Sequence, residues 1–327
     1  MCSSKVPRGA WNSFEEVSHA RLTEECQAWS CRSSVIVQTA IAKDDSYKMR
    51  VSRYEMDPTT RGLTDIPDEI LQICFARLSL EDVPRVKVVC KRWRRLGDAQ
   101  LLRRLRRTYG FMQNCTFILD NKYVGGQYQG LKGVAIDSKT CKGHHIATLR
   151  SPQRLQFGAA GIDGQIYVLG GRSPLICRKS PKAWIVYSRV DVYDPLSNSW
   201  CERQPMHVAR YGFATGVISD MATGNLKIIV AGGYNAEGEA LSSAEVYDFG
   251  KDRWDAISSM STVCGPCKGE MFQGKFLVQQ ANGGLDAVEI YDSALCLWSA
   301  FGPEFSEFCL KPSPEINATV KSVTIDL

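Results

Sequence analysis

Histidine is scarce in this chain of 327 residues, and long apolar runs and a large net charge are missing as well. Only four histidines are present, and no apolar run approaches the ~20 residues that a membrane-spanning helix needs. The N-terminus also lacks the apolar core of a signal peptide, since its longest apolar stretch is Val35-Ile36-Val37. These absences argue against a membrane protein and a secreted one. The sequence predicts a cytoplasmic or nuclear protein.

Cysteine is plentiful but irregularly placed. The count of thirteen is odd, and the spacing matches no disulfide framework, so we expect a reducing compartment. Cys264 and Cys267 form one CxxC without a second pair or a nearby histidine, which favours two ordinary thiols over half of a zinc site. No metal and no cofactor is expected.

Motifs for catalysis are lacking too. A copper site would need converging histidines, and His144, His145 and His207 stand in no ligand-like pattern. No GxSxG, P-loop or paired-carboxylate motif is present. The sequence therefore predicts a binding protein and not an enzyme.

Positive charge is concentrated in one segment. Residues 85–107 hold ten Lys or Arg against one acid, Asp98, although the whole chain carries only +5. Residues 1–60, by contrast, show no persistent helical or strand period, and we expect a largely disordered extension with, as an alternative, a short partner-binding peptide.

A compact helical block is predicted over residues 61–108. Ile66, Ile70, Leu71, Phe75 and Leu78 follow the spacing of one helix face, after Pro67, Asp68 and Glu69 in a first turn. Ser79 to Asp82 break the run and cap a second helix that ends near Leu96, and a third short helix holds Leu101, Leu102 and Leu105.

The order of these residues resembles an F-box. The opening Pro67-Asp68-Glu69, the Arg77-Leu78 at the end of the first helix and the run Val89-Cys90-Lys91-Arg92-Trp93 in the second carry the resemblance, and Cys74 departs from it where a larger aliphatic residue is usual. An unrelated three-helix bundle with a basic face is the alternative. The resemblance implies docking on the Skp adaptor of a cullin–RING ubiquitin ligase, and through it on a cullin. The residues expected at that contact are Pro67, Ile70, Leu71, Leu78, Val89 and Trp93.

The basic clusters at 91–95 and 103–107 leave nucleic-acid binding and nuclear import as rival interpretations. Both clusters contain Leu or Trp at helical spacing, which favours one amphipathic face over a free basic arm, so nucleic acid is the less favoured partner.

A repeat dominates the region after the helices. In three units six residues separate a Tyr from the Trp that follows it, and a glycine-led apolar run precedes each pair. The first two runs end in glycine pairs, Gly170-Gly171 and Gly232-Gly233, whereas the third has Gln280-Ala281 in those positions. The aromatic pairs are Tyr193/Trp200, Tyr247/Trp254 and Tyr291/Trp298.

These units resemble kelch repeats, each of which builds one four-stranded blade of a β-propeller. The resemblance implies that the glycine and aromatic pairs pack between blades, as structural residues. About four units, one of them a degenerate unit near Asp137, are recognisable over residues 109–310, with 311–327 as a tail or an unfinished last blade. Either a small irregular ring forms or the propeller stays partly open. A generic β-sandwich is the alternative.

Residues 172–189 form a loop that is longer than its counterpart in the next unit. In kelch propellers this loop commonly lies on the face that receives target peptides, so Arg172, Arg178, Lys179, Lys182 and Trp184 are candidate contacts for an acidic target segment. A solvated insertion without a partner is the alternative.

The fold expected is therefore multi-domain, a small helical F-box followed by an all-β kelch propeller, of a kind found chiefly in plants. The function implied is that of a substrate adaptor in an SCF-type (Skp–cullin–F-box) ubiquitin ligase, with the propeller holding the protein substrate. The alternatives are a kelch scaffold without ligase coupling and, less favoured, a kelch-fold oxidase. The sequence does not name the target.

Overall fold

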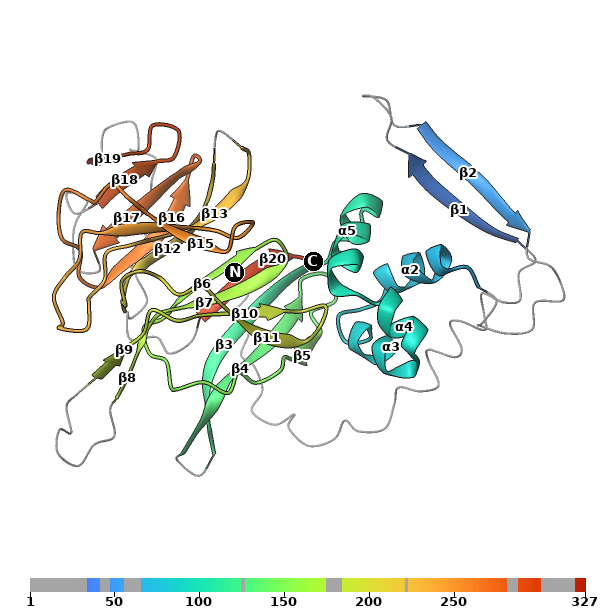
Figure 1. The fold of residues 1–327 in the computed structure, drawn as a ribbon, viewed down its shortest axis with the longest axis horizontal. Coiled ribbons are helices and arrows are strands. Elements are labelled where there is room, and N and C mark those ends of the chain that lie inside the picture. Colours follow the sequence, from blue (N-terminus) through green and yellow to red (C-terminus); the bar gives the residue numbers. More distant parts are fainter. Residues whose placement is uncertain are drawn as a thin grey trace, which may run out of the picture. The chain divides into compact units, whose positions relative to one another are not determined.

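The computed structural model describes residues 34–41, 48–55, 66–124, 127–174, 184–220, 223–280, 288–300 and 321–327. The chain divides into two compact units, Met1–Leu71 and Gln72–Leu327. Figure 1 shows their helices and strands. No helix in the described ranges is both long and apolar enough to cross a membrane.

The first unit contains a two-stranded antiparallel hairpin. Strand β1 (Ser34–Ile41) pairs with β2 (Lys48–Glu55) from the register Ser34↔Glu55 to Ile41↔Lys48. The expectation of a largely disordered extension over 1–60 is therefore wrong for these two segments. Both contain β-branched residues that favour extended backbone, a signal that a search for strict alternation does not detect.

Four helices follow, one more than expected. They are α2 (Asp68–Ala76), α3 (Val83–Val89), α4 (Lys91–Leu96) and α5 (Ala99–Tyr109). The predicted second helix is divided because Cys90 is extended, at φ −158° and ψ 170°, and its sulfur accepts a hydrogen bond from the Trp93 amide at 3.4 Å. Asp98 caps α5 through the Leu101 amide at 3.0 Å, and Gly110 ends that helix in the left-handed region at φ 69°.

After the helices, the described residues form four four-stranded antiparallel sheets, which we call the first to fourth blades. From the inner to the outer strand, the first blade is β20 (Lys321–Asp326), β3 (Asn114–Val124), β4 (Gln127–Asp137) and β5 (Gly143–His145). The second is β6 (Gly158–Ile162), β7 (Gln165–Leu169), β10 (Val190–Asp194) and β11 (Ser199–Arg203). The strands β8 (Arg172–Pro174) and β9 (Trp184–Val186) form a small hairpin between β7 and β10.

The other two blades repeat the second one's order. The third blade is β12 (Ala214–Ser219), β13 (Leu226–Ala231), β14 (Ala244–Asp248) and β15 (Arg253–Ile257). The fourth is β16 (Cys267–Phe272), β17 (Lys275–Gln280), β18 (Val288–Asp292) and β19 (Leu297–Ala300). The predicted kelch-type propeller fold is confirmed, with four blades built from the described residues.

Strand β20 corrects the expectation of a tail or an unfinished last blade over 311–327. Residues 321–326 pair with β3 from Lys321↔Leu119 to Asp326↔Asn114, and so supply the inner strand of the first blade. The rest of the expected tail, 311–320, lies outside the described residues.

Adjacent blades pack through their inner strands in the order β20, β6, β12 and β16. Glycine permits the close approach: a Cβ at Gly216 of β12 would lie 2.6 Å from the Phe276 ring of the fourth blade. The glycine pairs turn sharply after β7 and β13 with φ between 52° and 92°, and a Cβ at Gly170 would lie 2.6 Å from the Arg210 carbonyl of the next blade.

The Tyr and Trp of each unit lie opposite each other on its third and fourth strands, with ring centroids 5.1 Å apart in all three blades. Each Trp also donates its indole N–H to a carbonyl just beyond the outer strand of the preceding blade: Trp200 to Ala147 at 2.7 Å, Trp254 to Gln204 at 2.9 Å and Trp298 to Ser258 at 2.7 Å. These tryptophans therefore join neighbouring blades.

Candidate functional site: an apolar helix end and an aromatic loop face

Helix α3 ends in the most exposed apolar pair of its region. Val88 is 76% exposed and Val89 60% exposed, whereas Val83 and Val86 on the opposite side are buried. The expected contact list included Val89 and missed Val88. A seven-residue helix that buries two valines and leaves two in water offers an apolar surface that a partner can cover.

The other expected adaptor contacts differ in exposure. Pro67 is exposed, Ile70 and Leu78 are partly buried, and Leu71 is only 4% exposed. Trp93 is partly buried because its ring packs edge-on against Phe75, with centroids 5.0 Å apart. Leu71 thus fills the interior in the free chain and offers little surface to a partner.

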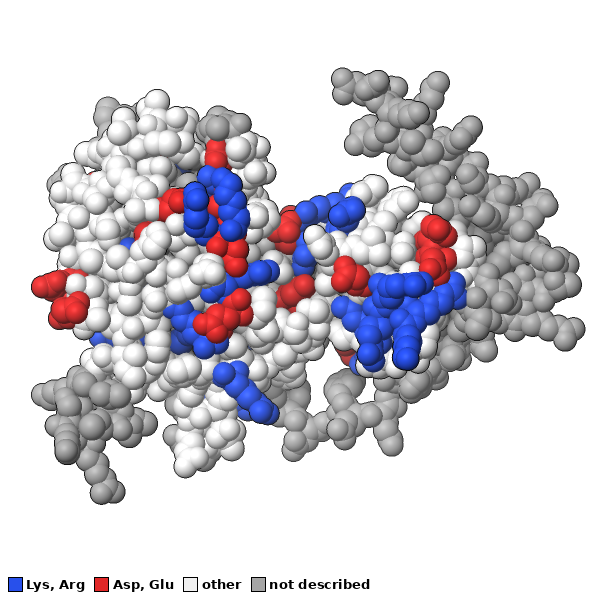
Figure 2. Space-filling view, viewed as in Figure 1, with Lys and Arg blue, Asp and Glu red and all other residues white. Residues whose placement is uncertain are grey.

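Basic side chains gather over α3 and α4 on the face shown in Figure 2. Lys91, Arg94 and Arg95 of α4 are exposed beside the apolar pair, and Arg94 donates to the Lys87 carbonyl at 3.2 Å. An acidic partner would find both apolar burial and charge complementarity here.

The arginines of α5 have a different role. Arg103 pairs with Asp194 of the second blade at 2.9 Å with both side chains largely buried, and Arg107 pairs with Asp163. Lys87 of α3 donates to the Leu196 carbonyl of the same blade at 3.2 Å. These contacts fasten α3 and α5 to the propeller, so three of the ten basic residues of 85–107 join the helices to the second blade.

Arg106 of α5 connects the segment after α2 with the residue that precedes β3. It is fully buried and donates to the Leu78 carbonyl at 2.5 Å and to Gln113 at 3.2 Å. Burial lowers the pKa of its guanidinium to about 10, which still leaves it charged at neutral pH.

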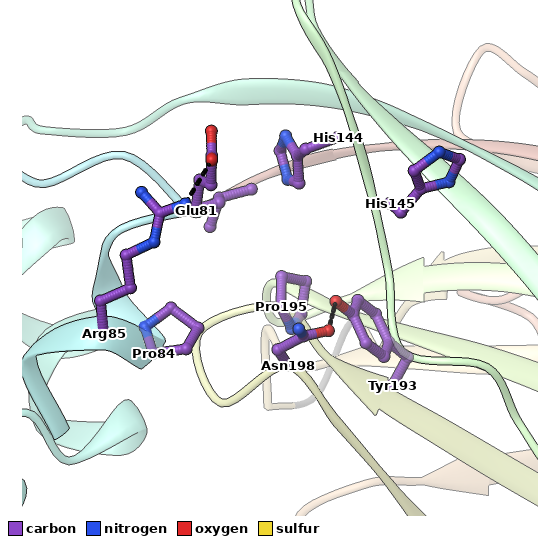
Figure 3. Close-up of a pocket in the computed structure, with 9 residues that line it drawn as sticks. Glu81, Pro84, Arg85, His144, His145, Tyr193, Pro195 and Asn198 are labelled. Atoms are coloured by element: carbon purple, nitrogen blue, oxygen red, sulfur yellow. Dashed lines mark hydrogen bonds and ion pairs between the residues drawn. The ribbon is translucent and has the colours of Figure 1, made fainter. Parts of the chain in front are cut away.

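A cavity of about 300 Å³ lies between the α2–α3 connection and loops of the first two blades (Figure 3). Glu81 pairs with Arg85 at 2.7 Å on one side, and the Tyr193 hydroxyl donates to Asn198 at 2.8 Å on the other. Burial lowers the pKa of His144 and so favours its neutral form. None of the nine lining residues is a Ser, Thr, Cys or Lys.

The β8–β9 hairpin and two turns of the third blade together form a stacked set of side chains that we call the loop face: Arg172 and Trp184 of the hairpin, Tyr211 before β12 and Tyr234 after β13. The Arg172 guanidinium lies 4.1 Å from the Trp184 ring centroid and 4.3 Å from that of Tyr211, and Tyr211 stacks on Tyr234 at 5.3 Å. Trp184 is 42% exposed. Of the predicted loop contacts, Arg172 and Trp184 are thus brought together, whereas Arg178, Lys179 and Lys182 lie outside the described residues.

Sequence reasoning missed Tyr211 and Tyr234. Tyr211 directly follows the buried Arg210, and Tyr234 directly follows the second glycine pair. The positions of the two tyrosines next to Arg210 and the glycine pair could be read from the sequence. The stacking of Tyr211 on Arg172 could not, because it depends on how adjacent blades meet.

Metal ligands do not cluster in the part of the chain that the structure describes: no group of three or more His, Cys, Asp or Glu is placed to hold an ion. His207 instead lies 3.3 Å from Glu245, an acid that already accepts two backbone N–H groups.

The sequence matches two protein families, F-box domain over residues 63–105 and Kelch motif over residues 153–207 and 220–261. It is 27% identical over 250 residues to the F-box/kelch-repeat protein At1g67480 of Arabidopsis thaliana, covering 74% of this chain and 61% of that protein. It is also 27% identical over 250 residues to the F-box/kelch-repeat protein SKIP30 of the same plant, covering 73% and 66%. A solved structure, that of YjhT, aligns with a TM-score of 0.44 and 19% identity over 53% of this chain and 59% of that one. The predicted resemblance to plant-type F-box/kelch-repeat proteins is confirmed.

Proposed function

We propose that this protein is the substrate-recognition adaptor of an SCF-type ubiquitin ligase. Its F-box docks on a Skp-type adaptor and through it on a cullin, and the kelch propeller binds the protein to be ubiquitinated. The observation that carries the proposal is the exposed pair Val88 and Val89 beside the basic residues of α4 in a matched F-box domain. A cytoplasmic or nuclear location accompanies the proposal.

The junction between α5 and the second blade supports this role. Arg103 and Arg107 each pair with an aspartate of that blade, and Lys87 adds a third contact. An adaptor that holds its F-box firmly against its propeller keeps a bound target at a set position relative to the ligase, which raises the effective concentration of target lysines. The transfer chemistry would belong to other subunits.

Adaptor binding is testable with a matched pair of surface changes. Changing Val88 and Val89 to Glu should weaken binding of a purified Skp adaptor by about 100-fold or more, because each valine buried at an interface contributes about 1.5–3 kcal/mol. Leu295 and Leu297 of the fourth blade are 67% and 59% exposed, so changing both to Glu adds the same charge at similarly exposed apolar positions elsewhere and is the control.

Titration calorimetry of the full chain with the adaptor measures the difference. Equal affinity of the wild-type chain and the Val88/Val89 variant would overturn the assignment of this surface. A wild-type chain that fails to bind the adaptor at all would instead favour the kelch scaffold without ligase coupling. Bound copper together with oxidase turnover would instead establish the kelch-fold oxidase.

A further inference from the structure

The CxxC of the fourth blade stands where the two preceding blades have a different pair of residues. The second and third blades place an Arg and, three residues later, a Phe just before or at the inner strand: Arg154 with Phe157, and Arg210 with Phe213. Arg210 lies ten residues after Trp200, and Cys264 likewise lies ten residues after Trp254, so Cys264 and Cys267 occupy the positions of Arg210 and Phe213 in the fourth blade. The contacts of the glycine turns support this correspondence: Gly170 lies against Arg210 and Phe213, just as Gly232 lies against Cys264 and Cys267.

The two cysteines lie where the third and fourth blades meet, both against Gly232. Cys264 is 5% exposed and Cys267 7% exposed, and neither is in a disulfide. Both side chains converge on Gly232 across the Gly265-Pro266 turn, because a Cβ at Gly232 would lie 3.0 Å from the Cys267 sulfur and 3.1 Å from the Cys264 Cβ. The Cys267 sulfur also lies 3.5 Å from the Ala231 carbonyl, over Gly232, where a Cβ would approach it to 3.0 Å.

The surroundings shift the pKa values of the two thiols in opposite directions. The hydrogen bond from Cys264 lowers the pKa of Cys267 despite burial, helped by the backbone amides of Gly233 and Ala214 and by the charge of Arg210. The same bond and burial raise the pKa of Cys264. This is the division between an attacking thiolate and a protonated partner that dithiol oxidation uses.

We propose that Cys264 and Cys267 are a redox-modifiable dithiol that hydrogen peroxide converts to an intrachain disulfide. The Cys267 thiolate attacks one peroxide oxygen, the O–O bond breaks, and Cys267 sulfenic acid forms with release of hydroxide. The Cys264 sulfur then attacks the Cys267 sulfur, an S–S bond forms, and the hydroxyl leaves with the Cys264 proton as water. In total, two thiols and one peroxide give one disulfide and two waters, with two electrons passing from sulfur to oxygen.

This site adjoins the loop face. Gly265, between the cysteines, lies directly against Tyr234, because a Cβ at Gly265 would be 2.6 Å from the Tyr234 hydroxyl. Drawing the two sulfurs together to the ~2.05 Å of a disulfide changes the turn that supports this ring. Oxidation would therefore reach the surface proposed to receive targets.

The full-length chain supplies a convenient readout. Trypsin cleavage after Arg253 and after Lys268 releases one peptide, 254–268, that contains both cysteines. The chain is treated with graded hydrogen peroxide, quenched, denatured, alkylated with iodoacetamide and digested. The disulfide form of this peptide lacks two hydrogens and takes no alkyl group, and dithiothreitol should restore double alkylation. Oxygen added at Met260 is scored separately.

Cys201 and Cys296 are exposed cysteines without a CxxC neighbour and serve as internal controls. We expect the disulfide form of peptide 254–268 at peroxide doses that convert the control cysteines only to sulfenic and higher acids. Cys264→Ser should abolish that form and leave Cys267 to be oxidised to acids. Double alkylation of peptide 254–268 at doses that oxidise Cys201 would overturn the proposal, as would acids in place of the disulfide in the wild-type chain.

Discussion

Replacing Arg210 with Met tests how the strands of the third blade are tied to the loop that leads into it. Arg210 is fully buried and donates to Glu245 at 2.8 Å, to the carbonyls of Gly232 and Ser243 at 3.0 Å each, and to the Ser243 hydroxyl at 3.2 Å. Glu245 in turn accepts the backbone N–H groups of His207 and Val208 at 2.7 and 3.1 Å. One buried side chain thus ties a glycine turn, a strand and the loop before β12 together.

The structure sets the size of the loss. The Met variant leaves the Glu245 carboxylate buried without its cation and deprives the Gly232 carbonyl of its arginine donor. Removing one partner of a buried ion pair costs about 3–5 kcal/mol. For a region of this size that corresponds to a fall in Tm of roughly 6–20 °C, at about 2–4 °C per kcal/mol.

The fourth blade shows how an acid at this position manages without arginine. Glu289 accepts the backbone N–H groups of Ser261 and Thr262 at 2.8 and 2.9 Å and, in addition, the Thr262 hydroxyl at 2.5 Å. Val208 occupies the place of Thr262 in the third blade, because both donate their N–H to the acid. Val208→Thr should therefore restore part of the stability lost in Arg210→Met.

Thermal unfolding of the full chain followed by circular dichroism measures the loss, and hydrogen exchange of peptides from the third blade locates it. Val208→Thr in the wild-type background is the matched control and should not raise Tm. A loss below about 1 kcal/mol for Arg210→Met would show that the two backbone donors satisfy Glu245 by themselves. The absence of rescue by Val208→Thr would refute the comparison with the fourth blade.

Three further predictions concern single side chains. Trp254→Ala removes a ring that is 2% exposed, together with its hydrogen bond to the Gln204 carbonyl, and should destabilise the chain by about 3–5 kcal/mol in denaturant unfolding. The loss should exceed that of Trp298→Ala, because Trp298 is partly exposed. Unchanged stability with loss of a specific activity would contradict the packing role. Trp184→Ala should leave Tm nearly unchanged, because the ring is exposed. If the ring contributes about 2 kcal/mol to target binding, the substitution should speed dissociation of a captured target about 30-fold in surface plasmon resonance. A large fall in Tm would show instead that the ring is structural. Burial alone would raise the pKa of Glu289, but its hydrogen bonds to Thr262 and Ser261 outweigh burial and lower that pKa below 4.5. The stabilisation from Glu289 is therefore present above about pH 4.5 and is lost as pH falls through the folded-state pKa. Glu289→Gln should flatten the acid side of a Tm–pH curve, and an unchanged acid slope would disprove this.

The sequence by itself determined the features that depend on neighbours along the chain. The F-box helices follow from the period of Ile70, Phe75 and Leu78, and the blades from a Tyr–Trp spacing that returns three times. Such signals are readable because helix faces and hairpins join residues only a few positions apart. The division of the second helix at Cys90 was missed because one extended residue leaves the apolar period almost intact.

Only the tertiary structure decided the contacts between distant segments. Strand β20 pairs with β3 across about two hundred residues, and nothing local in either strand names its partner. Arg103 and Arg94 look alike in the sequence, yet one is buried against Asp194 and the other is exposed, because the second blade covers one side of α5. The stacking of Arg172 on Tyr211, and of the Gly265 turn on Tyr234, likewise arises where blades meet, and the close packing that sets those positions is a property of the whole fold.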